Sequence, residues 1–599
     1  MAFQDFDQIS ERRRNERRQK LRRRITIAVV SCVVILLAVA GAAVGLVYYR
    51  QQGEKGGGGN SHAPATKEIS QSEKAVKTIC APSDYKQVRV YIVFNTSNYT
   101  CETSLSKAIK NKGANVQPKD LLRAAITVTA AELKNAINQT AHLKFDKPEL
   151  KGAYEDCVEL LNDGLEELNS SVSTVDTQNM GQLAGAAPDL KNWLSAVMSY
   201  QQTCIDGFPE GDIQNSMKKA LKSAKELTSN ALAIIGQVSS VLREVQATPA
   251  GTARHLLGAD GLPTWVSEEE RRMLKGTGAP DGKKLPPNVT VAKDGSGNFA
   301  TINEALKAMP EKYEGRYVIY VKEGIYEEYV TVTKKMVNVT IYGDGSQKTI
   351  VTGNKNFADG VRTFQTATFV AEGDGFMAQS IGFRNTAGPE KHQAVAIRVK
   401  ADRAFFLNCR MEGYQDTVYA QAHRQFYRSC LITGTVDFIF GDSAAIFQNC
   451  MIYLRRPLDN QQNIVTAQGR SDRHETTGIV LQNCRILADD TLEPEKTKVR
   501  SYLGRPWKEF SRTVVMETDI GDLINPEGWM PWNGDFALKT LYYAEFNNKG
   551  AGSPTSGRVK WPGFKVINKE EAEKFTIEPF IQGNTWLNSQ DFPVHFGLF

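Results

Sequence analysis

Two aspartates have the spacing and surroundings to act as a chemical pair. Asp416 lies in the run QDTVY and Asp437 in the run DFIFG, 21 residues further along the chain. Two carboxylates held close together cannot both ionise freely, so one shifts toward its protonated form while the other stays anionic. Such a pair supplies a general acid and a nucleophile or base. A single aspartate is more often a turn or surface residue, so the chemistry depends on whether the fold brings these two together.

The chain around these aspartates repeats itself at almost the same interval. The runs FFLNC, FYRSC and IFQNC end at Cys409, Cys430 and Cys450, with steps of 21 and 20 residues. A period in this range is typical of a solenoid built from stacked coils. If one coil takes about 21 residues, the two aspartates occupy equivalent positions on adjacent rungs, roughly 4.8 Å apart in a parallel sheet. The matched register therefore favours a shared site.

Residues 288–599 carry the pattern of a right-handed parallel β-helix. Short β-branched and aromatic runs, such as NVTIYGDG, AVAIRV and GIVLQNC, are separated by Gly, Asn and Asp without hairpin dipeptides. Strands this short with a regular repeat favour a β-helix over a sandwich. Inward residues of successive coils stack in ladders, so we expect Phe406, Cys409 and their equivalents in the core.

Residues 70–245 read as an all-α helical bundle. Apolar residues recur at helical spacing on three stripes. The stripes are Leu122, Ile126, Leu133 and Ile137; Tyr154, Cys157, Leu161 and Leu168; and Leu190, Leu194, Val197 and Cys204. Cys157 and Cys204 lie on these apolar faces, so they could be buried small hydrophobic residues or partners in a disulfide.

The N-terminus predicts a transmembrane signal anchor. Residues 1–24 form a basic tail with nine Arg or Lys against four Asp or Glu, and residues 25–49 contain no charge. An uncharged run of this length can cross a bilayer and is longer than the apolar part of a cleavable signal peptide. The basic residues precede the span, which predicts a cytosolic tail and a lumenal remainder.

Two segments of different composition separate the predicted domains. Residues 50–69 are rich in Gly and polar residues, which is typical of a flexible linker. Residues 246–287 alternate Gly, Pro and charged residues, which predicts an exposed linker open to proteolysis.

Composition and motifs exclude several classes of function. The basic tail accounts for five of the six net charges, and residues 281–599 hold 38 basic against 37 acidic residues, so the totals give no reason to expect nucleic-acid binding. A local basic groove is not visible in such totals. No CxxC pair or histidine cluster suggests a metal, and no GxSxG-like serine suggests a serine triad. Nine cysteines and six Asn-x-Ser/Thr triplets fit a secreted, disulfide-bonded chain.

Five short motifs connect residues 288–599 to a known family. GIYEE, QAVAI, QDTVY, DFIFG and LGRPW follow one another in this order over about 180 residues. Together they resemble the pectin methylesterases of plant cell walls. The helical region before them resembles the inhibitor domain that many members carry as a pro-region. The resemblance implies pectin as substrate, no cofactor and a mature enzyme in the cell wall, while the predicted anchor implies a precursor held in a membrane of the secretory pathway.

The resemblance also implies roles for individual residues. Asp437 would be the nucleophile, and Asp416 the general acid and then the base. Gln393 and Gln415 would stabilise the oxyanion, and Arg505 would hold Asp437 ionised. Thr363, Gln393, Arg505 and Trp507 would contact the substrate. Each has a plainer reading: the glutamines could cap side-chain ladders, Arg505 could form a surface salt bridge, and Trp507 could be a core aromatic.

Cysteines and the linker complete the implied features. The resemblance implies disulfide bonding for Cys80, Cys101, Cys157, Cys204, Cys430 and Cys450. The run Arg254, His255, Leu256 and Leu257 resembles the basic processing site of the family, with His255 in place of a second basic residue. The segment 88–100, which reads as a strand, separates Cys80 from Cys101 and departs from the close spacing usual in the family.

Two other functions fit part of the pattern. Two carboxylates about 5 Å apart also describe a retaining glycosidase, so a polysaccharide hydrolase or lyase on the same fold is one alternative. A pectin-binding or inhibitor protein without turnover is the other. The presence of both aspartates, both glutamines and the arginine favours an active esterase.

Overall fold

A computed structural model describes residues 80, 101–108, 117–246, 286–587 and 594–599. The predicted tail, membrane anchor and first linker within residues 1–69 lie outside these ranges, as do most of the linker 246–287 and the insert 88–100. None of the helices in the described ranges is long and apolar enough to span a bilayer.

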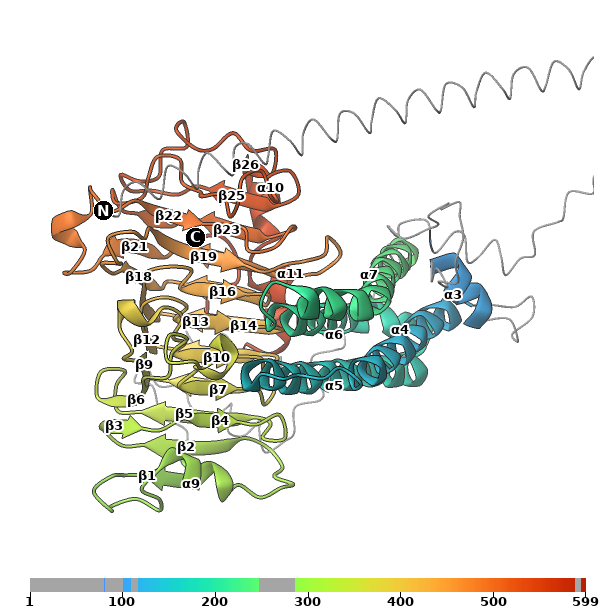
Figure 1. Cartoon of the computed structure of the whole chain (residues 1–599), viewed down its shortest axis with the longest axis horizontal. Coiled ribbons are helices and arrows are strands. Elements are labelled where there is room, and N and C mark those ends of the chain that lie inside the picture. Colours follow the sequence, from blue (N-terminus) through green and yellow to red (C-terminus); the bar gives the residue numbers. More distant parts are fainter. Residues whose placement is uncertain (1–79, 81–100, 109–116, 247–285, 588–593) are drawn as a thin grey trace, which may run out of the picture. The chain divides into compact units, whose positions relative to one another are not determined.

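The predicted helical bundle is present (Figure 1). Its helices are α3 (Cys101–Ala108), α4 (Pro118–Thr140), α5 (Pro148–Thr177), α6 (Met180–Asp206) and α7 (Asp212–Gln246). Helices α4 and α5 begin at prolines, whose missing N–H costs nothing in the first turn. Helix α6 begins at a capping box formed by Asn179 and Gln182. The predicted apolar stripes face the interior, with Ile137 and Tyr154 packed at its margin.

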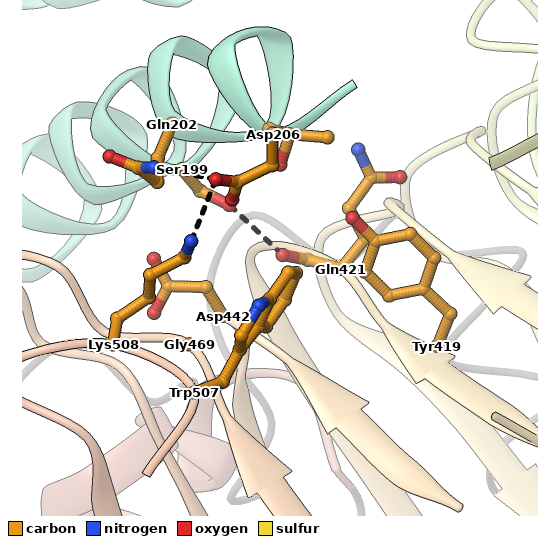
Figure 2. A pocket seen from close by; sticks show the side chains of 10 residues that line it. Ser199, Gln202, Asp206, Tyr419, Gln421, Asp442, Gly469, Trp507 and Lys508 are labelled. Carbon is orange, nitrogen blue, oxygen red and sulfur yellow. Dashed lines mark hydrogen bonds and ion pairs between the residues drawn. The ribbon is translucent and has the colours of Figure 1, made fainter. Parts of the chain in front are cut away.

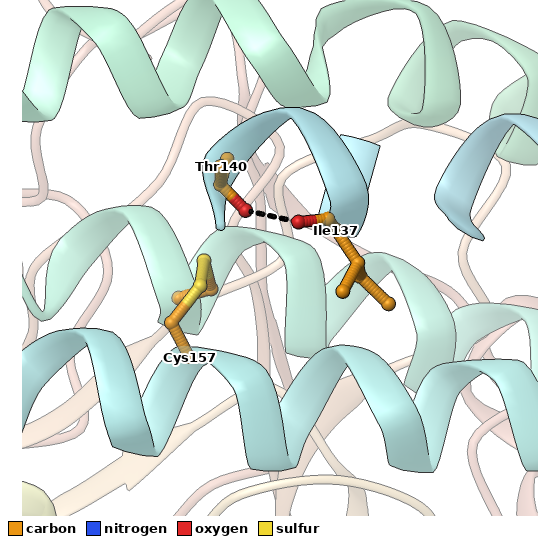
Figure 3. The surroundings of a disulfide bond; sticks show 4 residues. Ile137, Thr140 and Cys157 are labelled. Carbon is orange, nitrogen blue, oxygen red and sulfur yellow. Dashed lines mark hydrogen bonds between the residues drawn. A yellow bond between two sulfur atoms is a disulfide. The ribbon is translucent and has the colours of Figure 1, made fainter. Parts of the chain in front are cut away.

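Two disulfides hold the bundle together. Cys157 and Cys204 are bonded, joining α5 to α6 near the end of α4 (Figure 3). There the Thr140 hydroxyl donates to the Ile137 carbonyl over 2.9 Å. Cys80 is bonded to Cys101 at the start of α3, on either side of the unusual insert. Both bonds confirm the prediction of disulfides in this region.

The second part of the chain is a parallel β-helix, in which successive strands pass in turn to three sheets (Figure 1). Every strand pairing in these sheets is parallel. The eleven-stranded sheet contains β1 (Val289–Val291), β2 (Tyr317–Val321), β5 (Val339–Gly343), β8 (Met377–Gln379), β11 (Ala404–Leu407), β14 (Arg424–Arg428), β17 (Ala444–Gln448), β20 (Gly478–Gln482), β23 (Arg512–Met516), β25 (Tyr542–Phe546) and β26 (Phe564–Val566).

The other two sheets complete each coil. The eight-stranded sheet contains β3 (Gly324–Glu327), β6 (Thr349–Gly353), β9 (Gly382–Asn385), β12 (Arg410–Glu412), β15 (Leu431–Gly434), β18 (Met451–Leu454), β21 (Arg485–Ala488) and β24 (Asp519–Ile520). The seven-stranded sheet contains β4 (Val330–Val332), β7 (Phe369–Ala371), β10 (Ile397–Val399), β13 (Val418–Ala420), β16 (Ile439–Gly441), β19 (Asn463–Gln468) and β22 (Ser501–Gly504).

Short helices flank the sheets. They are α9 (Ile302–Lys307), α10 (Lys569–Glu573) and α11 (Ile577–Ile581). Ile577 and Phe580 of α11 pack with Phe426 and Ile446 on the outer face of the eleven-stranded sheet. This cover buries the apolar outer face of these strands, which would otherwise meet water.

The small polar residue before each repeated cysteine has a structural cause. Asn408, Ser429, Asn449 and Asn483 all adopt a left-handed backbone, with φ between 51° and 55°. Short polar side chains tolerate this conformation best after glycine, and it lets the chain turn sharply from one sheet to the next. The cysteine that follows then points inward, and the four side chains are buried in the core.

Cys430 and Cys450 are free thiols, so the predicted disulfide for these two residues is wrong. They lie at equivalent positions on adjacent coils, where each thiol donates a weak hydrogen bond to a backbone carbonyl of the neighbouring coil. The acceptors are Phe406 for Cys430 and Tyr427 for Cys450, both at 3.5 Å. The cysteines therefore act as small core residues.

Aromatic side chains stack along the same axis. The Tyr427 ring lies between Phe406 and Phe447, with centroid distances of 4.8 and 4.3 Å and nearly parallel planes. The pairing of β11, β14 and β17 sets these distances, because adjacent parallel strands lie roughly 4.8 Å apart. The expected ladder of core residues is confirmed.

Candidate active site

The fold places Asp416 and Asp437 at equivalent positions. Each lies two residues before a strand of the seven-stranded sheet, Asp416 before β13 and Asp437 before β16. The two strands pair with Val418 opposite Ile439, an offset of 21 residues that also matches the aspartates. The Asp416 N–H donates to the Val436 carbonyl over 3.1 Å. The predicted register is therefore confirmed.

Both aspartates have a left-handed backbone and little exposure. Their φ angles are 65° and 52°, and their exposed fractions are 8% and 6%. A residue other than glycine in this region is strained unless its surroundings hold it there. The shared turn directs both carboxylates to the same end of their strands.

Burial and neighbouring charges affect the pKa values of the two carboxyl groups differently. Burial raises the pKa of Asp416 well above its ordinary value, and the neighbouring Asp437 raises it further against a lowering effect of Arg505. Burial also raises the pKa of Asp437, but hydrogen bonds and charge from Arg505 oppose the rise. Asp416 is thus the group more easily held protonated, and Asp437 the one stabilised as an anion.

Arg505 follows β22 and binds Asp437 with both arms of its guanidinium group. Its Nε donates to Oδ1 over 2.8 Å and its Nη2 to Oδ2 over 2.5 Å. The guanidinium also lies 4.4 Å from the centre of the Trp532 ring. A bidentate pair of this kind fixes the carboxylate in one orientation. The salt bridge of the plainer reading is present, but its Asp437 partner is buried.

The two glutamines lie side by side on the same end of the sheet. Gln393 and Gln415 form a parallel bridge, and the Ala394 N–H donates to the Gln415 carbonyl over 3.2 Å. Gln415 directly precedes Asp416 in the chain. Within the described ranges, the buried side-chain oxygen of Gln393 has no hydrogen-bond partner. This oxygen could accept a hydrogen bond from a polar ligand.

Thr363 and Trp507 lie toward opposite ends of the seven-stranded sheet. Thr363 opens the 3-10 helix η1 (Thr363–Gln365) before β7, and Trp507 follows β22. The Trp507 ring is half-buried and meets Phe440 edge to face at 6.0 Å. A side chain on Gly469 would lie 2.8 Å from this ring, so glycine allows the close approach.

Comparison with known proteins shows to which family the chain belongs. A family model described as Pectinesterase matches residues 288–584, and one described as Plant invertase/pectin methylesterase inhibitor matches residues 74–234. A probable pectinesterase/pectinesterase inhibitor 13 from Arabidopsis thaliana is 53% identical over 530 residues, covering 88% of this chain and 83% of the relative. The chain belongs to the pectinesterase family.

Two other similar proteins match different shares of the chain. Pectinesterase 1 of Citrus sinensis is 45% identical over 495 residues, which cover 80% of this chain and 83% of that protein. A solved pectin methylesterase from carrot is 52% identical with a TM-score of 0.52, and covers 53% of this chain and 99% of its own. The β-helix, called the pectinesterase domain below, thus corresponds to a whole carrot chain. The helices before it are called the inhibitor-like bundle.

The inhibitor-like bundle packs against the pectinesterase domain next to the two aspartates. Leu160 of α5 and Tyr200 of α6 join an apolar cluster with Val395, Tyr419 and Phe440 on the seven-stranded sheet. Tyr419 and Phe440 lie on the strands that directly follow Asp416 and Asp437. The bundle therefore covers the outer face of the strands that carry the site.

Figure 2 shows the polar part of this contact, where α6 lies over Trp507. The Lys508 ammonium group lies 2.7 Å from Asp206, and the Ser199 hydroxyl donates to the Gln421 carbonyl over 3.1 Å. These groups line a small pocket together with Trp507. Docking of the bundle thus closes off one face of the predicted sugar contact.

Ion pairs extend along the same interface. In each pair an acidic residue of the bundle meets a basic residue of the pectinesterase domain. The pairs are Asp156 with Arg362, Asp163 with Lys334 and Lys400, Asp189 with Arg403 and Arg424, and Asp206 with Lys508.

A buried histidine lies at the centre of the interface. His423 Nδ1 is 3.1 Å from the Asn192 amide, and Nε2 is 3.0 Å from the Tyr200 hydroxyl and 3.4 Å from the Glu167 carboxylate. Burial lowers the pKa of His423, but Glu167 and the domain's own Asp402 and Asp374 outweigh burial and raise the pKa above its ordinary value. The docked state therefore favours the charged imidazole.

Sequence reasoning missed the residues that join the two parts of the chain. Arg362 and Lys508 are the chain neighbours of the predicted contacts Thr363 and Trp507, which was the one available signal. Nothing in a single sequence pairs them with residues 206 and 302 positions away.

In the described ranges, no group of three or more His, Cys, Asp or Glu side chains could hold a metal ion.

Proposed function

We propose that the pectinesterase domain hydrolyses methyl esters of polygalacturonate to pectate and methanol, with Asp437 as nucleophile and Asp416 as acid and base. The observation that carries the proposal is the pair of buried aspartates on adjacent coils, one bound by Arg505 and the other held toward its neutral form. Family membership supports the reaction class.

The first half of the reaction forms an acyl-enzyme. The Asp437 carboxylate attacks the ester carbonyl carbon, and the carbonyl oxygen becomes an oxyanion that accepts hydrogen bonds from the amides of Gln393 and Gln415. Neutral amides supply these bonds without adding a full charge. As the oxyanion collapses, the bond to the methoxy oxygen breaks and Asp416 gives that oxygen its proton, so methanol leaves.

The second half restores the enzyme. Asp416, now a carboxylate, takes a proton from water while the water oxygen attacks the acyl carbon. The bond to Asp437 breaks, the product acid leaves and gives its remaining proton to solvent, and Asp416 is again protonated. Arg505 stabilises Asp437 both before attack and as it leaves. Thr363 and Trp507 hold the neighbouring sugar residues, the flat face of Trp507 suiting a sugar ring.

Methanol and chain ends distinguish this reaction from cleavage of the polymer backbone. Methylated pectin is incubated with the protein after removal of the bundle, and methanol and new reducing ends are measured together. We expect methanol without new chain ends. New chain ends without methanol would replace the esterase with a polysaccharide hydrolase or lyase, and binding without either product would indicate a pectin-binding protein.

We infer that the inhibitor-like bundle restrains the enzyme until a protease cuts the linker at Arg254, His255, Leu256 and Leu257. The bundle covers strands next to the site and a predicted sugar contact, which supports the inference. Residues 25–49 would tether the precursor to a secretory-pathway membrane, with the mature enzyme acting in the cell wall. These segments lie outside the described residues.

A further inference from the structure

Two cations flank the row of predicted substrate contacts. Arg362 directly precedes Thr363, and Lys508 directly follows Trp507. They lie near strands β7 and β22, which are five steps apart in the seven-stranded sheet, a separation of roughly 24 Å. Strands β13 and β16, which follow Asp416 and Asp437, lie between them. The two cations thus lie on either side of the reacting centre.

Carboxylates of the bundle form ion pairs with both cations. Asp156 accepts two hydrogen bonds from Arg362, over 2.6 Å from Nε and 3.0 Å from Nη2, and Asp206 accepts one from Lys508 over 2.7 Å. Among the described residues, no acidic side chain of the pectinesterase domain itself forms an ion pair with either cation. When the bundle leaves, both positions lose their anion.

The geometry suits recognition of a sugar acid. Arg362 presents its guanidinium fork to a planar carboxylate, the arrangement in which arginine binds such groups most specifically. Lys508 lies with its ammonium 4.9 Å from the centre of the Trp507 ring, so one position combines a flat apolar surface with a positive charge. A galacturonate residue has these two features, an apolar sugar face and a carboxylate.

We infer that Arg362 and Lys508 bind free carboxylates of galacturonate residues on either side of the ester under attack, and that Asp156 and Asp206 take the place of those carboxylates while the bundle is docked. The inference rests on the proposed function. Because each reaction converts an ester to a carboxylate, the product itself creates the group that these two positions recognise. The enzyme would therefore bind partly de-esterified pectin more tightly than fully esterified pectin.

Binding measurements on the pectinesterase domain test this. The full chain is cut at a protease site engineered between residues 258 and 285, and the bundle is removed at high salt. The carrot relative supports a stable remainder, since this half of the chain matches nearly all of it. Calorimetry then measures binding of an unesterified and a fully methyl-esterified oligogalacturonide of equal length to wild type, Arg362→Gln and Lys508→Gln.

We expect each substitution to weaken binding of the unesterified oligomer about threefold to fivefold, the effect of one partly exposed ion pair, with a much smaller effect on the esterified oligomer. Arg362→Lys and Lys508→Arg, which keep the charge, should restore most of the binding. Lys574→Gln is the matched control, because Lys574 pairs with Glu571 at the end of α10, which packs on the eleven-stranded sheet.

Equal weakening of both oligomers, or none, would overturn the inference and leave the two cations as docking residues for the bundle. Loss of binding in the charge-keeping variants as well would also overturn it, because the loss would then be structural. Methanol release by the wild-type domain is measured separately. Its absence would refute the proposed function without changing the comparison of the two oligomers.

Discussion

Asp416 and Asp437 have the same backbone conformation and different electrostatic surroundings. The turn places both carboxyl groups at one end of the sheet, and Arg505 binds one of them. Two identical side chains can thus take two roles without any difference in chain geometry, because the nearest charge sets which of them is ionised. Burial raises both pKa values, so the arginine opposes a real cost of desolvation.

The pH dependence of kcat follows from these shifts. Activity requires Asp437 as an anion and Asp416 as an acid, so it rises with pH as Asp437 ionises and falls as Asp416 loses its proton. Arg505 lowers the pKa of Asp437, so we expect Arg505→Gln to move the rising limb of the profile to higher pH, in addition to lowering kcat. Arg505→Lys, which keeps the charge, should move it less. An unchanged rising limb in Arg505→Gln would contradict the role given to the arginine.

The pairing of Asp416 with Asp437 could be predicted because both belong to one repeat, whereas Arg505 and Trp507 were assigned from the family resemblance. The offset of 21 residues between Asp416 and Asp437 equals the offset at which β13 pairs with β16. Partners from the bundle could not be predicted, because Asp206 and Lys508 share no repeat and no spacing rule. Their meeting depends on how two separately folded parts dock.

At the scale of elements, stacked side chains hold the coils together. The ring of Tyr427 fills the space between Phe406 and Phe447 and is fully buried. We expect Tyr427→Ala to lower the free energy of unfolding by about 3–5 kcal/mol, the usual cost of removing a buried aromatic ring. Chemical denaturation of the pectinesterase domain measures the change. Phe357→Ala, at a position 52% exposed, serves as control and should cost less than about 0.5 kcal/mol.

The cysteines show where the family resemblance misleads. The repeat that placed the aspartates also placed Cys430 and Cys450 among the inward residues of the core, whereas their disulfide was expected only from the resemblance. Parallel coils instead align equivalent residues as a column, in which each thiol bonds to a backbone carbonyl. In the bundle, Cys157 and Cys204 come from two packed helices, and there the bond forms.

His423 makes docking of the bundle depend on pH. Its pKa is raised in the docked state, and Glu167 of the bundle supplies part of this rise, so that part of the stabilisation is present at low pH and is lost as pH rises through the docked pKa. The groups that face it are Glu167, Tyr200 and Asn192 from the bundle and Asp402 and Asp374 from the β-helix.

We expect the bundle of linker-cut protein to dissociate more readily as pH rises, and His423→Gln to flatten this dependence. Size-exclusion chromatography of the cut protein over a pH series measures the bound fraction. His142→Gln, at an exposed position beyond α4, is the control. A His423→Gln profile identical to wild type would show that other groups set the pH dependence.

At the scale of the whole molecule, the chain contains an enzyme and a covalently attached cover. The inhibitor-like bundle contacts the pectinesterase domain through an apolar cluster and several ion pairs. Added salt screens the ion pairs. We expect uncut protein to release methanol at least tenfold more slowly than protein cut in the linker and freed of the bundle, and the difference to shrink with added salt. Equal rates at low salt would contradict restraint by the bundle.

Helix α7 ends at Gln246 and β1 begins at Val289, close to the limits of 245 and 288 that helical periodicity and the short β-runs predict. The way in which the bundle docks could not be predicted, because the residue pattern on the outer face of a sheet does not show whether that face contacts solvent or another domain. The membrane anchor and the processing site remain predictions from composition, as they lie outside the described residues.

Methanol release by Asp437→Asn tests the central claim most directly. The substitution keeps the size of the side chain and removes the attacking oxygen anion, so we expect a loss on the order of 10⁴-fold or more in kcat with an unchanged circular dichroism spectrum. Asp459→Asn, at an exposed side chain, should keep full activity. An Asp437→Asn protein that is correctly folded and retains more than about a tenth of wild-type activity would contradict the assignment of the nucleophile.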